Sequence, residues 1–230
     1  NIPSIAAVAP ENLQQYAETL ERFAPRTIER ILRMLKQFFS YCYEHGYTNE
    51  RLTPSVPKIR VPREIHLPAT FTREETASLL SAVDRSNALG KRDYAILTMA
   101  AFLGMRISDI IGLTFDEIDW VKRTLSILQQ KTGKLVELCC AIGDDTVDGL
   151  PYEQIGWAII DYLQNGRPQS SCRHVFIKHC APYDELTPSM SRTLHKYLRR
   201  AHIESPAGKP IGMHAFRHSL ASAMLENGVS

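Results

Sequence analysis

The clearest hydrophobic pattern of the chain lies in residues 25–45 and predicts an amphipathic helix that ends at Gly46. A basic stripe on the same helix, formed by Arg26, Arg30 and Arg33, is either solvated or turned toward phosphate groups, and this segment leaves both interpretations open. The apolar side chains recur every three or four residues, and we expect them to form one buried stripe: Ile28, Ile31, Leu32, Leu35, Phe38, Phe39 and Cys42.

Residues 54–68 contain four prolines and predict a linker. Closely spaced prolines favour extended backbone and prevent helix formation, because each fixes φ and lacks an amide hydrogen. The same segment carries Lys58 and Arg60. We therefore expect a helical domain over residues 1–62 and a larger domain over residues 63–230.

Helical patterns dominate the chain after this linker. Thr72 and Glu75 have the spacing of a capping box, which predicts a helix from there to about Val83. Gly104 is expected to end a later helix, and Ser108 to cap the next one. These later helices are expected over residues 91–103, 108–113, 152–164, 189–201 and 215–227.

A β-hairpin is predicted between these helices. Residues 124–130 and 135–141 alternate apolar and polar side chains, and Thr132 and Gly133 supply a turn between them. Residues 174–178 are also predicted to form a strand. The fold class is therefore mainly α with a small antiparallel β-sheet.

Composition and charge exclude some classes of protein. The chain has 230 residues, 44% of them hydrophobic, which is enough apolar surface to exclude a wholly disordered chain. No run approaches the roughly 20 apolar residues of a membrane span, so no membrane partner is expected. The net charge is only +2, but the basic excess lies toward the two ends of the chain.

The five cysteines are odd in number and contain no CxxC pair, which favours a reducing compartment and a cytoplasmic location. Cys172, His174, His179 and Cys180 are residue types that bind zinc. They flank the expected strand, so a zinc site would need ligands to converge from both of its ends. We favour ordinary residues beside a strand and expect no metal.

Three short segments carry candidate chemistry. Arg106 lies among apolar residues, where a guanidinium needs a partner, and Asp109 is the candidate to orient it. Lys131 is expected near the tip of the hairpin, where most lysines are simply solvated. His214 and Arg217 are three residues apart on a predicted helix, so they share a face and can address one anion. Each segment taken alone also fits a purely structural role.

Taken together and in this order, these segments resemble the tyrosine recombinase (phage integrase) family. The resemblance covers the chain from about Phe71 to its end and rests on "RDYAILTMAAFLGMRISDIIGLTFDEID", "LSILQQKTGKLVEL", "HVFI" and "HAFRHSLASAMLENG". The segment "RTIERILRMLKQFFSYCYEHGY" looks like the latter half of that family's core-binding domain. The resemblance implies a helical core-binding domain followed by a mixed α/β catalytic domain.

The resemblance also implies DNA strand breakage and rejoining without a metal or other cofactor, through a 3′-phosphotyrosine intermediate. It places Arg106, Arg217 and His214 on the scissile phosphate and makes Lys131 the proton donor to the leaving 5′ oxygen. These residue types suit the roles, because guanidinium groups stabilise charge on phosphate oxygens and a flexible ammonium can donate a proton. The implied DNA-binding residues of the first domain are Arg26, Arg30, Arg33, Lys58 and Arg60.

The nucleophile is where the sequence departs from the family. The family's tyrosine follows the helix of the H-x-x-R motif, whereas all nine tyrosines here precede His214. We therefore expect no nucleophile in this chain, and a piece of a longer protein that does not itself cleave DNA. The first domain is likewise expected to be truncated at its start.

The expected partner is double-stranded DNA. The resemblance implies a tetramer on DNA for a full-length protein and a monomer for this piece. Two other interpretations remain open from the residues alone. The chain could be a non-catalytic DNA-binding protein of the same fold, or a helical regulator that binds no DNA and uses these residues structurally.

Overall fold

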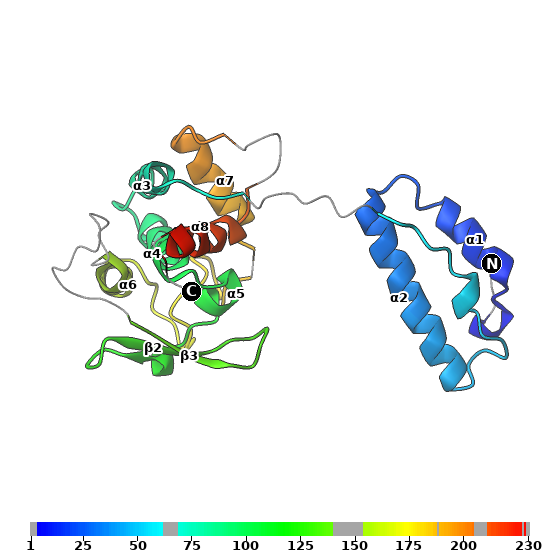
Figure 1. The fold of residues 1–230 in the computed structure, drawn as a ribbon. Helices are drawn as coiled ribbons and strands as arrows, with labels where there is room; N and C mark the ends of the chain where they lie inside the picture. The colour runs from blue at the N-terminus through cyan, green and yellow to red at the C-terminus, as the bar shows by residue number, and fades with distance from the viewer. Residues whose placement is uncertain are drawn as a thin grey trace. The chain divides into compact units, whose positions relative to one another are not determined.

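The chain folds into two compact units, Asn1–His66 and Leu67–Ser230. The computed structural model describes residues 4–61, 69–139, 154–187, 189–204, 211–226 and 228. The predicted domain boundary between residues 62 and 63 lies outside these described residues. Figure 1 shows the elements of each unit.

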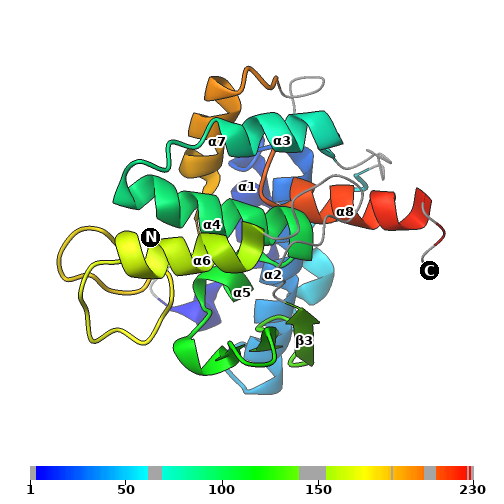
Figure 2. The ribbon, with the colours of Figure 1, turned by 90° about the vertical axis from the view of Figure 1, so that its left-hand side faces the viewer.

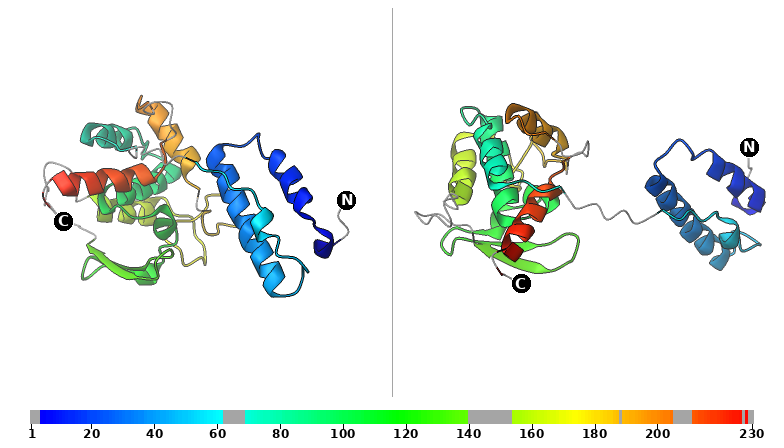
Figure 3. Two further views of the ribbon diagram at one scale, coloured as in Figure 1. Left: turned by 45° about the vertical axis from the view of Figure 1, so that its right-hand side comes forward. Right: turned by 45° about the horizontal axis from the view of Figure 1, so that its top comes forward.

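The first unit is a small helical body. Its core contains Leu13, Leu20, Leu32, Phe39, Leu52 and Val56. The elements of this unit are η1 (Ile5–Ala7), α1 (Pro10–Glu18), α2 (Pro25–Glu44) and η2 (Thr53–Ser55). The short helix η2 contacts both α1 and α2, which lie side by side in Figures 1 and 3.

Helix α2 confirms the predicted amphipathic helix, with Gly46 in the left-handed conformation just beyond it. One position of the predicted buried stripe is wrong, because Phe38 is 45% exposed while its neighbour Phe39 is buried. Consecutive helical residues point about 100° apart, so Phe38 falls at the edge of the stripe. The predicted linker also begins too early. Val56 is buried in the first unit's core, so residues 54–56 belong to that unit.

The second unit is built around α4, which is buried along most of its length. Such a helix must be apolar on nearly every side, because other elements surround it. Helices α5, α6 and α8 pack directly against it, and Figure 2 shows α6 running alongside α4. The helices of this unit are α3 (Arg73–Ser81), α4 (Ala88–Leu103), α5 (Ile107–Ile111), α6 (Gln154–Asn165), α7 (Ser191–Arg200) and α8 (His214–Glu226).

A small antiparallel sheet covers one side of this helical body. It has three strands in the order β1-β2-β3: β1 (Ile118–Asp119), β2 (Thr124–Leu128) and β3 (Leu135–Cys139). Strands β2 and β3 form the predicted hairpin, in which Leu128 pairs with Leu135. Leu125 and Ile127 point into the core while Ser126 and Leu128 are exposed, which matches the predicted alternation. Residues 140 and 141 of the prediction lie outside the described residues.

The start of the second unit is fixed to α8. Thr72 and Glu75 form the predicted capping box at the start of α3. The backbone amide of Phe71 donates a hydrogen bond of 2.6 Å to Ser219 Oγ, and the Phe71 ring lies 4.6 Å from that of Phe216. The residues that follow the linker therefore pack on the helix that begins at His214.

Two local predictions in this unit are wrong. Residues 174–178 form no strand, and only isolated bridges join Thr114 to His174 and Ile177 to Glu185. The buried residues Val175–Ile177 satisfy a strand-like pattern without a strand neighbour along their length. Ser108 is not an N-cap, because α5 begins one residue earlier, at Ile107, and Arg106 occupies the cap position. The Arg106 carbonyl accepts the backbone amides of Asp109 and Ile110.

Candidate functional site

The corner between α4 and α5 positions the first candidate residue. Helix α4 ends at Gly104, whose φ of +57° lies in the left-handed region that glycine adopts without steric cost. The chain then turns through Arg106, whose extended backbone starts α5. The Gly104 carbonyl accepts a hydrogen bond of 2.9 Å from Arg217 Nη1. This corner is thereby joined to α8, which lies far along the chain.

The guanidinium of Arg106 is anchored through a single nitrogen. Arg106 Nη1 donates to Gln129 Oε1 at 3.0 Å and lies 3.8 Å from Asp109 Oδ2. The Asp109 side chain is 3% exposed and also accepts the backbone amide of Gln130 at 3.3 Å. Within the described residues, Arg106 Nε and Nη2 make no hydrogen bond. These two donors remain available to an anion, and a guanidinium presents them in a fixed planar geometry.

A cavity of about 210 Å³ lies between this corner and the hairpin. Arg217 lines it, and Arg106 is bonded to two other lining residues, Asp109 and Gln129. Arg217 is therefore a wall of this cavity, whereas Arg106 is connected to it through Gln129 and Asp109. The cavity is large enough for several waters or a small anion. The lining residues are Leu103, Gly104, Met105, Asp109, Ile127, Gln129, Val136, Leu138 and Arg217.

The other two predicted site residues lie on the same elements as these arginines. Lys131 is exposed in the turn between β2 and β3, two residues after Gln129. His214 is exposed as the first residue of α8, one turn before Arg217. Neither side chain forms a hydrogen bond or ion pair within the part of the chain that the structure describes. The structure therefore places Arg106 in direct contact with Asp109. Arg217 lines the same cavity as Asp109 and bonds to the Gly104 carbonyl, and Lys131 and His214 are brought near only through their elements.

The predicted DNA-contacting residues of the first unit are all exposed: Arg26, Arg30, Arg33, Lys58 and Arg60. Arg33 lies 3.7 Å from Glu29 one turn away, an exposed pair that contributes little to stability. A solvated face and a phosphate-binding face both require this exposure, so it does not separate the two interpretations.

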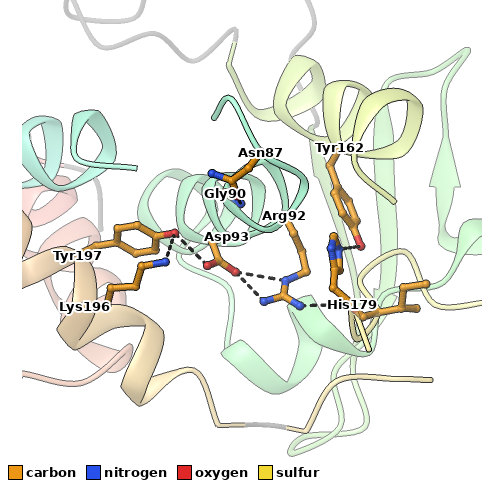
Figure 4. A network of polar contacts seen from close by, with 9 residues as sticks. Asn87, Gly90, Arg92, Asp93, Tyr162, His179, Lys196 and Tyr197 are labelled. Carbon is orange, nitrogen blue, oxygen red and sulfur yellow. Dashed lines mark hydrogen bonds and ion pairs between the residues drawn. The ribbon is translucent and has the colours of Figure 1, made fainter. Parts of the chain in front are cut away.

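A second polar cluster is buried between α4 and α7 (Figure 4). Tyr197 Oη donates to Asp93 Oδ2 at 3.0 Å, and Arg92 binds the other Asp93 oxygen at 2.8 Å. Tyr197 is 1% exposed. Burial, together with the charge of Asp93, raises the pKa of Tyr197 above its ordinary value. The buried hydroxyl is bonded to Asp93 and is not presented to solvent, so Tyr197 has a structural role in this fold.

The cysteines and histidines considered as zinc ligands do not converge. Cys172 Sγ lies 3.5 Å from His174 Nδ1, and the other nitrogen of His174 faces Glu185 at 3.6 Å. His179 instead contacts Tyr162 Oη at 3.2 Å (Figure 4), and burial lowers the pKa of His179. Among the residues that the structure describes, no group of three or more His, Cys, Asp or Glu side chains could hold a metal ion. No helix of that part is both long and apolar enough to cross a membrane.

Sequence reasoning missed two features of the site. The first is Gln129, whose side chain binds Arg106 across the cavity. A glutamine at the end of a strand carries no local signal for such a contact. The second is the Gly104 carbonyl as the partner of Arg217. Gly104 was recognisable as a helix end, but only the fold shows which side chain its carbonyl meets.

The chain is similar in sequence to known proteins over most of its length. The chain is 32% identical over 214 residues to the putative integrase/recombinase y4rA of Sinorhizobium fredii. The matched region covers 92% of this chain and 48% of that protein. It is 28% identical to the tyrosine recombinase XerD of Lacticaseibacillus casei, over 89% of this chain and 65% of that protein. The chain therefore spans about half to two thirds of the length of these relatives.

The fold is also that of solved integrases. A crystal structure of a lambda integrase dimer bound to a COC′ core site superimposes with a TM-score of 0.70, at 14% identity, over 97% of this chain and 59% of that one. The profile described as the phage integrase family matches residues 69–230, which include the corner, the hairpin and α8. The chain belongs to the phage integrase family.

Proposed function

We propose that this chain is the DNA-binding and phosphate-activating part of a site-specific recombinase that breaks and rejoins DNA. One observation carries the proposal: Arg217 lines the cavity next to the hairpin, and Arg106 contacts two other residues that line it, Gln129 and Asp109. Two anchored guanidinium groups suit a phosphodiester, whose non-bridging oxygens gain negative charge when the phosphorus is attacked.

Each residue has a distinct role in the proposed reaction. Arg106 and Arg217 bind non-bridging oxygens of the scissile phosphate, and His214 adds a third donor. A tyrosine hydroxyl loses its proton to solvent and attacks the phosphorus, forming the 3′-phosphotyrosyl bond while the bond to the 5′ oxygen breaks. Lys131 gives its proton to that leaving 5′ oxygen. No metal or other cofactor is needed for this exchange of one phosphoester for another.

The attacking hydroxyl is not among the residues that the structure places at the site. All nine tyrosines precede His214 in the sequence, and Tyr197 is sealed beside Asp93. These 230 residues are therefore expected to bind double-stranded DNA without forming a covalent bond to it, because the cations stabilise a transition state but supply no nucleophile. We further propose that the first unit, with its exposed basic face, is a core-binding domain.

Duplex binding tests the phosphate site. Fluorescence anisotropy at several salt concentrations should show that Arg106→Ala and Arg217→Ala each weaken binding and flatten the salt slope by about one unit per lost phosphate contact. Lys122→Ala is the matched control, because Lys122 lies two residues before β2, at the end of that strand away from the hairpin turn, is exposed and carries the same charge. Equal losses from all three variants would mean that the cavity is not the phosphate site.

A suicide DNA substrate and a denaturing gel test the chemistry. The 230-residue chain should give no protein–DNA band, whereas a reading frame extended to a downstream tyrosine should give one, and Arg106→Ala in that longer chain should remove it. An extended chain that binds DNA but never forms the band would favour the alternative, a non-catalytic DNA-binding protein of this fold. A band from the 230 residues alone would refute the assignment of the nucleophile.

A further inference from the structure

Gln129 occupies the point where the site and the hairpin turn meet. It follows the last residue of β2 and is half-buried. Its side-chain oxygen accepts two hydrogen bonds, from Arg106 Nη1 at 3.0 Å and from Thr132 Oγ1 at 2.7 Å. One carbonyl-type oxygen thus joins a guanidinium on the α4–α5 corner to the turn that contains Lys131.

The turn does not need this side chain to close. The Gln129 backbone amide donates to the Lys134 carbonyl at 2.9 Å, and the Gly133 amide donates to the Gln129 carbonyl at 2.8 Å. These two backbone bonds already define the turn. The side-chain oxygen adds a connection that crosses to a different segment, which a purely local turn residue would not make.

We propose that Gln129 is a positioning residue that sets the Arg106 guanidinium and the Lys131 turn together. This inference rests on the proposed function, in which Arg106 binds the phosphate and Lys131 protonates its leaving oxygen. The contacts of Arg106 to Gln129 and Asp109 both use Nη1, so Gln129 holds that end of the guanidinium, and in the proposed reaction Nε and Nη2 serve the phosphate. Binding of Thr132 by the same oxygen restricts the turn beside Lys131.

A double-mutant cycle read by NMR tests the connection in the chain itself, without any reaction. In the wild-type background, Arg106→Ala should shift the backbone amide signals of Lys131, Thr132 and Gly133, because Gln129 loses its partner. In a Gln129→Ala background, the same Arg106→Ala change should shift these signals about threefold less, since the link is already gone. Additive shifts in the two backgrounds would overturn the proposal.

Three further variants separate positioning from folding. Gln129→Glu keeps an acceptor oxygen of the same reach and should retain most of the coupling. Thr132→Ala removes only the turn half of the link and should loosen Lys131 while leaving Arg106 anchored. Gln130→Ala is the matched control, because that neighbouring side chain is exposed and makes no hydrogen bond among the described residues. Loss of coupling in Gln130→Ala equal to that in Gln129→Ala would overturn the proposal.

Addition of duplex DNA distinguishes failure of this inference from failure of the proposed function. DNA should shift the Arg106 Nε–Hε and Lys131 amide signals together in the wild type, and in Gln129→Ala the Lys131 shift should fall about threefold relative to that of Arg106. If DNA shifts neither signal in the wild type, the proposed function is wrong, while the DNA-free cycle still decides whether Gln129 links the two segments. If both signals move equally in Gln129→Ala, Gln129 is not the positioning residue.

Discussion

Replacement of Gly104 by alanine perturbs the site through the backbone and through packing at once. The φ of +57° is unfavourable for any residue with a Cβ, at a cost of about 1–2 kcal/mol. A Cβ at this position would lie 2.8 Å from Leu220 Cδ2 on α8. The end of a leucine side chain can turn aside, so we expect the total loss of folding free energy to be about 2–4 kcal/mol. The substitution should also shift the carbonyl of residue 104, which accepts the hydrogen bond from Arg217.

Gly133 provides a matched control for the backbone part of this loss. Its φ of +63° is similar, but no atom lies within 4 Å of a Cβ built there. Gly133→Ala should therefore cost only about 1–2 kcal/mol. Both tryptophans, Trp120 and Trp157, lie in the second unit, so their fluorescence reports its unfolding in urea. With a slope of about 2 kcal/mol per molar, Gly104→Ala should lower the urea midpoint by about 1–2 M.

The packing part is tested by removing the atom that the new Cβ meets. In the double variant Gly104→Ala with Leu220→Ala, the combined loss should be smaller than the two single losses added together, by about 1 kcal/mol. The reasoning is refuted if Gly104→Ala costs no more than Gly133→Ala, or if the double variant is additive.

Three further predictions concern the basic helix, the buried Tyr197 and the half-buried His179. Arg30→Ala and Arg33→Ala should weaken binding to two unrelated duplexes equally and flatten the salt slope by about one unit per lost contact; a loss for one sequence only would contradict a phosphate role. Because burial raises the folded-state pKa of Tyr197, only the unfolded chain loses this proton above about pH 10, so stability should fall with rising pH. Tyr197→Phe should flatten that fall in urea midpoints between about pH 9 and 11, and an unchanged slope would speak against it. The folded-state pKa of His179 is lowered by burial and by Arg92, so the unfolded chain alone gains this proton below about pH 6.5 and stability should fall with falling pH. His179→Gln should reduce that fall in urea midpoints between about pH 7 and 5. An unchanged fall would mean that the histidine has the same pKa in the folded and unfolded states.

Local sequence features predicted much of the fold, because local interactions set them. The apolar spacing in α2, Gly46 beyond its end and the capping box of Thr72 and Glu75 all depend on residues within one or two turns. Helix α1 was not predicted, because Ala9 before it offers no capping side chain. The short helix α5 was misplaced by one residue. Its start is set by the turn after Gly104, not by the hydroxyl of Ser108.

The sequence by itself determined which residue types could act on a phosphate and in what order they occur, through the segments around Arg106, Lys131 and the pair His214 and Arg217. Only the tertiary structure decided how they are held. The partners of Arg106 and Arg217 are Gln129 and the Gly104 carbonyl, which come from segments far apart along the chain. Hydrogen bonds between distant segments depend on how helices pack and where a hairpin falls, and no local pattern of side chains encodes them. For the same reason Tyr197 looked like any other tyrosine until packing placed it beside Asp93, out of reach of DNA.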